Sequence, residues 1–415
     1  MNGPNRLQVT VAAVLCMALD MSAIFMGSFP VFLGPVSRDM GWGHAVFSQV
    51  ITISSVCAAL LMPFAGRLID RIGVRWPVAI GLTLIGLSMV LLSFMRGTDT
   101  FFWTAALSLG VGASLAGPPS FVALVSSWYD RHRALALSVV LSVTPMCAQA
   151  IVAPVVQKLI VGFGWRETYQ VLAGTVLIVG LAASLTSLRP NPSGIAMKPL
   201  PAVTKRSSSH AATTGTFWLL VTANCLLSAS LIGFSVHIVG WLTSRSISPE
   251  SASAVMSVLF LSGVAGALLS ASFVDKTSSL RIVQLFFAIP LVGLAIMAAT
   301  TSLPLVLLGA VLLGAGMSAT SALTPFLLTR YFGLKGSAEI FGILLGLTMI
   351  AIGLAPVLIG LGIDRTGGYT IPLSFVTGAV VVATFCIGLL DRLRVATAKQ
   401  DDQAPARTLP SGSHQ

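Results

Sequence analysis

Apolar runs of about 20 residues recur along the whole chain, and each is long enough to cross a hydrocarbon layer about 30 Å thick as an α-helix. A bilayer offers no water to satisfy backbone polar groups, so such runs must fold as helices. Charged residues make up 9% of the chain, whereas a soluble domain carries about 25%. The sequence therefore predicts an all-α, multi-pass membrane protein.

Polar breaks divide these runs into about twelve predicted spans. The longest break, 189–215, is rich in Pro, Ser and Thr, with four basic residues and no acidic one. We expect it to be a flexible linker between an N-terminal six-helix bundle, 1–188, and a C-terminal six-helix bundle, 216–392. We expect residues 393–415 to form a disordered tail.

The basic residues indicate the orientation of the spans. If both termini are cytoplasmic, few of the 24 Lys and Arg residues fall in outer loops, as the positive-inside rule requires. We therefore place the protein in the inner (plasma) membrane with cytoplasmic termini. The outward-facing exceptions are Arg38, Arg96, Lys158, Arg166, Arg245 and Arg365.

The two halves resemble one another weakly. The stretch "SRDMGWGHA" at Ser37 corresponds to "SRSISPESA" at Ser244, and Ala153–Pro154 recurs as Ala355–Pro356. Parallel repeats of this kind are typical of a transporter architecture whose substrate site lies between the halves near the midplane. A channel would not require the duplication.

The stretch "GRLIDRIGVR" from Gly66 resembles the signature G-x-L-x-D-R-x-G-x-R/K of the major facilitator superfamily. The resemblance implies two six-helix bundles, secondary transport by alternating access, and a conformational latch that breaks and reforms. The latch residues would be Gly66, Asp70, Arg71, Gly73 and Arg75, in a loop where the glycines permit a tight turn. The alternative is that the arginines only set the topology.

The stretches "SSWYDRHRALALSVVLS" and "RYFGLKGSAEIFG" look like loops of the monocarboxylate-porter and oxalate/formate-antiporter branch. That resemblance implies transport of a small organic anion, a mono- or aromatic carboxylate, commonly with a proton. Antiporters of the superfamily often carry a G-P-x-x-G-G motif in the fifth span. This sequence keeps only the proline of that motif, Pro154, which favours uptake by symport.

The predicted eighth and eleventh spans lack the basic residue that this branch usually carries to pair with the substrate. The missing cation leaves open a second hypothesis, in which the substrate is a neutral or amphipathic solute. Such a solute would be a vitamin such as riboflavin, or a drug exported from the cell.

Asp20 lies midway along the first predicted span, where an aspartate costs roughly 2.5–3.5 kcal/mol on insertion scales. We predict that it carries the coupling proton, and the branch resemblance strengthens this prediction. The alternative is a neutral aspartate that is hydrogen-bonded to a neighbouring helix. His237 is a second proton-coupling candidate, or a structural histidine that bonds a backbone carbonyl.

Asn224 and Ser228 stand four residues apart in the seventh predicted span and share one helix face, and Gln149 lies in the fifth. We expect these three side chains to line the substrate cavity. The alternative is hydrogen bonding between helices, worth roughly 0.6–2 kcal/mol each.

The sequence gives no reason to expect a cofactor, a metal site or an enzyme. The five cysteines lie apart inside apolar runs, so they suggest neither a disulfide framework nor a metal site. No phosphate-binding loop and no nucleophile–base pattern occurs. The net charge of +11 is scattered over short loops, which favours membrane topology over nucleic-acid binding. We expect a monomer whose partners are the bilayer, a small-molecule substrate and a proton.

Overall fold

The computed structural model describes residues 5–129, 132–189, 214–277, 280–332 and 337–403, and these ranges contain helices and no strand. Three short π-helical segments interrupt the α-helices, at Met21–Phe25, Val139–Val143 and Val176–Gly180. The α-helices are α1 Arg6–Ala18, α2 Met26–Met40, α3 His44–Ile72, α4 Arg75–Phe94, α5 Thr100–Ala116, α6 Pro118–Trp128, α7 Arg133–Ser138, α8 Thr144–Phe163, α9 Trp165–Thr175, α10 Leu181–Ser187, α12 Gly215–Ser244, α13 Pro249–Thr277, α14 Leu280–Ala299, α15 Leu303–Phe332, α16 Ser337–Thr366 and α17 Thr370–Gln403.

The described residues contain nine helices long and apolar enough to cross a membrane, and one bent pair that forms a further span. Two shorter apolar helices, Val283–Ala299 and Leu303–Ser318, complete the set. The prediction of about twelve membrane helices is therefore confirmed.

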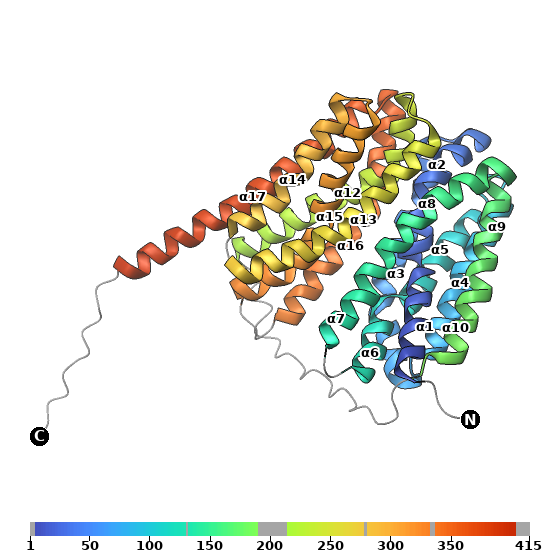
Figure 1. The fold of residues 1–415 in the computed structure, drawn as a ribbon, viewed down its shortest axis with the longest axis horizontal. Coiled ribbons are helices and arrows are strands. Elements are labelled where there is room, and N and C mark those ends of the chain that lie inside the picture. Colours follow the sequence, from blue (N-terminus) through green and yellow to red (C-terminus); the bar gives the residue numbers. More distant parts are fainter. Residues whose placement is uncertain (1–4, 130–131, 190–213, 278–279, 333–336, 404–415) are drawn as a thin grey trace, which may run out of the picture.

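The helices form two bundles, α1–α10 and α12–α17 (Figure 1). The bundles meet where α3 packs against α16, α8 against α13 and α2 against α12. We call the two ends of the molecule the His44 end, where α3 begins, and the Asp70 end, where α3 finishes. In Figure 1 the ribbons of the two bundles meet near α2 and separate toward the end where the N-terminus lies.

Each bundle contains a pair of glycines at which two helix backbones touch. A methyl group on Gly81 of α4 would lie 2.7 Å from the carbonyl oxygen of Gly112 on α5, and the reverse substitution would be equally close. Gly293 of α14 and Gly309 of α15 form the same reciprocal pair, at 2.6 and 2.8 Å. Small residues allow such close approach of membrane helices. These two pairs hold α4 against α5 and α14 against α15.

The stretch predicted as a loop around Asp70 is mostly helical. α3 continues to Ile72, so Gly66, Asp70 and Arg71 lie in its last turns, and no atom outside the local helix lies within 4 Å of a methyl group built on Gly66. The prediction that Gly66 forms a turn is wrong. Gly73, at φ 80°, ends the helix in a conformation that favours glycine, and α4 begins at Arg75.

The C-terminal helix is longer than the apolar run that predicts it. α17 continues to Gln403, into the segment 393–415 that the sequence predicts as a tail. Residues 190–213 of the predicted linker lie outside the described residues.

Candidate functional site

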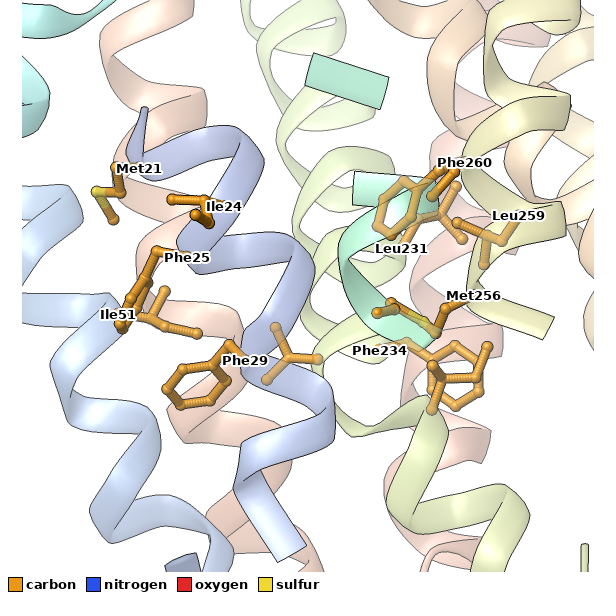
Figure 2. Packing of buried hydrophobic residues seen from close by; sticks show 14 of the residues in the cluster. Met21, Ile24, Phe25, Phe29, Ile51, Leu231, Phe234, Met256, Leu259 and Phe260 are labelled. Atoms are coloured by element: carbon orange, nitrogen blue, oxygen red, sulfur yellow. The ribbon is translucent and has the colours of Figure 1, made fainter. Parts of the chain in front are cut away.

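Two groups of buried apolar side chains lie on either side of the boundary between the bundles (Figure 2). Among the described residues, no Lys or Arg is buried, and Asp20 is the one buried acidic residue. The centre of the molecule is therefore apolar and nearly uncharged over these residues. The first group is Met21, Ile24, Phe25, Phe29 and Ile51, and the second is Leu231, Phe234, Met256, Leu259 and Phe260.

Asp20 lies at a break in the first span. α1 ends at Ala18, the π-helical segment begins at Met21, and the two pieces of the span are bent by 43°. The Asp20 side chain is 3% exposed, and its Oδ1 accepts hydrogen bonds from the Ser22 hydroxyl at 2.7 Å and the Ala23 backbone N–H at 2.9 Å. Asp20 thus caps the second half of its own span. The alternative given for Asp20 above, a neutral aspartate hydrogen-bonded to a neighbouring helix, expects a partner outside this span.

Gln149 connects this break to α8. Its Nε2 donates a hydrogen bond to the backbone carbonyl of Ser22 at 2.7 Å, and Ser22 donates its hydroxyl to Asp20. A methyl group on Gly27 would lie 2.9 Å from the Gln149 Cα, so α8 and α2 are in close contact beside the break. Gln149 and Asp20, predicted separately for different roles, therefore belong to one polar chain.

Asn224 belongs to a buried hydrogen-bond network inside the second bundle. Its Nδ2 donates to the Thr348 hydroxyl and its Oδ1 accepts from the Thr324 hydroxyl, both at 2.8 Å. These contacts join α12 to α16 and α15. Ser228, one turn away, is half-buried and has no hydrogen-bond partner among the described residues. The two predicted cavity residues thus have different surroundings.

His237 is fully buried and contacts the backbone of α16. Its Nε2 lies 2.8 Å from the carbonyl oxygen of Pro356, and its Nδ1 has no hydrogen-bond partner among the described residues. This contact with a backbone carbonyl agrees with the alternative interpretation of His237 as a structural histidine. The ring also lies near His44 of the first bundle, with ring centroids 6.1 Å apart.

The predicted latch residues lie at the Asp70 end. Asp70 is exposed and forms no hydrogen bond or ion pair with a described residue. The Arg75 guanidinium lies 5.5 Å from the centre of the Trp76 ring, while its Nε is buried without a hydrogen-bond partner in the described part of the chain.

A pocket of about 1090 Å³ at the His44 end is not predicted by the sequence patterns described above. Trp42 and His44 line it from the first bundle, and Trp241, Asp364 and Tyr369 line it from the second. One sequence pattern points to Asp364 in this pocket: the pattern Ile-Asp-Arg-x-Gly that contains Asp70 recurs around Asp364.

The chain resembles transporters in sequence and in structure. It is 22% identical to monocarboxylate transporter 12 of Homo sapiens over 90% of this chain and 77% of that protein. It is 26% identical to the uncharacterized MFS-type transporter YcxA of Bacillus subtilis over 41% of this chain and 40% of that protein. The nucleoside transporter NupG has the same fold, with a TM-score of 0.75, 14% identity and coverage of 92% of this chain and 99% of that one.

A bacterial homolog of the human lysosomal transporter Spinster, solved in an inward-facing and unoccupied conformation, also has this fold. Its TM-score is 0.73 and its identity 18%, over 98% of this chain and all of that one. The family model of the Major Facilitator Superfamily matches residues 11–338, which is most of the chain. The chain therefore belongs to the Major Facilitator Superfamily, as a membrane transporter rather than an enzyme.

Proposed function

We propose that the protein takes up a small organic anion, a mono- or aromatic carboxylate, together with a proton by alternating access. Membership of the superfamily supports secondary transport, and the similarity to monocarboxylate transporter 12 over most of the chain supports the carboxylate. The distribution of Lys and Arg supports cytoplasmic termini and the inner (plasma) membrane.

The observation that carries the proton coupling is the position of Asp20. Its carboxyl group is 3% exposed, at a bend of 43° in the first span, and no Lys or Arg pairs with it among the described residues. An unpaired carboxylate is costly at membrane depth, so protonation during the transport cycle relieves that cost. Its hydrogen bonds from Ser22 and Ala23 stabilise the carboxylate form when the proton has left.

Protonation of Asp20 also weakens the cap of the second half of the span. A neutral carboxyl is a poorer acceptor than a carboxylate for the Ala23 N–H, which lies 2.9 Å away. Binding of the proton thus acts on the place where the span bends. This link connects proton binding to a change in the shape of the helix.

A neutral or amphipathic substrate is the second candidate, either a vitamin such as riboflavin or an exported drug. It is favoured by the apolar boundary between the bundles and by the lack of a buried Lys or Arg in the described ranges. Apolar contacts with a few hydrogen bonds are the usual way to bind such a ligand.

The two candidates are separated by a ligand screen on the purified protein. A ligand that binds the folded state alone raises its melting temperature. We expect mono- or aromatic carboxylates to raise the melting temperature. We also expect uptake of the same compounds into proteoliposomes to lower the internal pH, as reported by a pH-sensitive dye inside. Stabilisation by neutral heterocycles alone, with no change in internal pH, would replace the first candidate by the second.

A further inference from the structure

Asp364, near the end of α16, caps the beginning of α3 across the boundary between the bundles. Its Oδ1 accepts hydrogen bonds from the His44 backbone N–H at 2.8 Å, and its Oδ2 accepts one from the Ala45 backbone N–H at 3.0 Å. The His44 Nδ1 lies 3.2 Å from the same Oδ1. A carboxylate at a helix N-terminus satisfies backbone donors and interacts favourably with the helix dipole.

Two glycines make this contact possible. A methyl group on Gly43 would clash with the Asp364 carboxylate, and one on Gly360 would lie 2.7 Å from the Ala45 backbone nitrogen. Further along the pair, the Thr52 hydroxyl donates to the Gly353 carbonyl at 2.6 Å. α3 and α16 therefore lie antiparallel and in close contact at the His44 end.

The groups around His44 come from three further places in the fold. Asp364 belongs to α16, and the Tyr369 hydroxyl lies 3.3 Å from His44 Nε2. His237 belongs to α12, and its ring centroid lies 6.1 Å from that of His44. Burial, and secondarily the charge of Asp364, raises the pKa of Tyr369 to about 12, so its hydroxyl stays protonated near neutral pH. Arg245 lines the same pocket but donates to the carbonyls of Met297 and Ala298.

The same five-residue pattern ends both helices of this antiparallel pair. α3 ends in Ile69-Asp70-Arg71-Ile72-Gly73, and α16 ends in Ile363-Asp364-Arg365-Thr366-Gly367. Both terminal glycines have positive φ, 80° and 68°. The aspartate at the His44 end is engaged across the boundary, whereas Asp70 is exposed without a partner among the described residues.

We propose that the Asp364 cap on α3 is the gate of the His44 end. The hydrogen bonds that Asp364 accepts from the His44 and Ala45 backbone N–H groups hold α3 against α16 when this end is closed, and they break when it opens. The inference rests on the alternating access of the proposed function, but on neither the substrate nor the coupling proton.

Distances between spin labels test the gate without any substrate, so failure of this test is distinct from failure of the proposed function. In a background without the five native cysteines, one label pair at Gly162 and Ser302 reports on the His44 end. A second pair at Leu135 and Ser272 reports on the Asp70 end. All four positions are exposed.

We expect Asp364→Asn to raise the ratio of open to closed His44 end by at least about fivefold, the lower range of coupling between two states. The matched control is Asp39→Asn, because Asp39 pairs with Arg166 at 2.8 Å at the same end but within one bundle. The control should leave the distances unchanged. A wild-type distribution in Asp364→Asn, or an equal shift in Asp39→Asn, would overturn the gate.

If Asp364→Asn does not fold, Gly360→Ala opens the same gate by steric clash with Ala45, and Gly346→Ala, with no atom outside its own helix within 4 Å, is its control. Unchanged distances in Gly360→Ala would likewise overturn the gate.

Discussion

The Gln149 amide and the Ser22 carbonyl are joined by a hydrogen bond of 2.7 Å between α8 and the broken first span. A break in a membrane helix frees backbone groups that must find new partners. Gln149 therefore fixes the position of the break relative to α8, and it places the Ser22 hydroxyl that binds Asp20. The break is thus held from two sides, by the contacts of Asp20 with Ser22 and Ala23 and by the Gln149 side chain from α8.

We predict that Asp20→Asn separates uptake from exchange. The amide mimics the protonated form, so substrate accumulation driven by a pH gradient should fall to the level of protein-free liposomes. Exchange of labelled for unlabelled substrate should persist. Both assays are run on one reconstituted sample with a pH-sensitive dye inside. Wild-type accumulation and acidification in the variant would leave Asp20 as a structural cap and make His237 the next candidate.

Asp70→Asn should slow net transport by roughly fivefold or more while leaving substrate affinity within about twofold. Asp70 is exposed and forms no hydrogen bond or ion pair with a described residue, so we expect its charge to act on the balance between conformations. Transport rates in proteoliposomes and ligand-induced melting shifts measure the two quantities. Asp99, which is half-buried and caps α5 inside one bundle, provides a control in Asp99→Asn. Equal rates for Asp70→Asn and wild type would reduce the latch to a topology signal.

Asn224→Leu should lower the free energy of unfolding by about 1–3 kcal/mol, because it leaves Thr324 and Thr348 without their buried amide partner. The change should be visible as a lower melting temperature in detergent. Ser228→Ala, one turn away, should leave the melting temperature unchanged because no described residue bonds its hydroxyl. A raised KM in Ser228→Ala would place that residue in the cavity, and equal stability of the two variants would contradict the network.

Gly27→Ala should disturb the break in the first span. The added methyl group would lie 2.9 Å from the Gln149 Cα, and such overpacking costs about 1–3 kcal/mol. We expect lower stability and slower exchange. Gly34→Ala, on the same helix with 3.9 Å of space to Arg38, is the matched control. Equal stability of Gly27→Ala and Gly34→Ala would contradict a tight contact between Gly27 and Gln149.

Tyr369→Phe should weaken the closed state of the His44 end. The variant removes the contact between the Tyr369 hydroxyl and His44 Nε2, which are 3.3 Å apart. The spin-label pair at Gly162 and Ser302 measures the change. Distances equal to those of the wild type would show that this contact has no part in the gate.

The apolar runs predict the helices because a bilayer leaves an apolar segment few alternatives. They do not predict the break at Asp20, since a side chain that caps a half-helix inside an apolar run has no periodic signal. The charged residues around Asp70 predict a loop. A helix can also carry them near its end, because long basic side chains extend from there to the membrane surface. Contacts such as His44 with Asp364 join residues 320 positions apart, beyond the reach of local patterns.

The reciprocal glycine pairs, Gly81 with Gly112 and Gly293 with Gly309, have a mechanical consequence. Backbone contacts without side chains do not change with rotamers, so α4 with α5, and α14 with α15, should each move as a pair. Changes in lateral pressure or bilayer thickness should therefore displace each pair as a unit rather than slide one of its helices past the other.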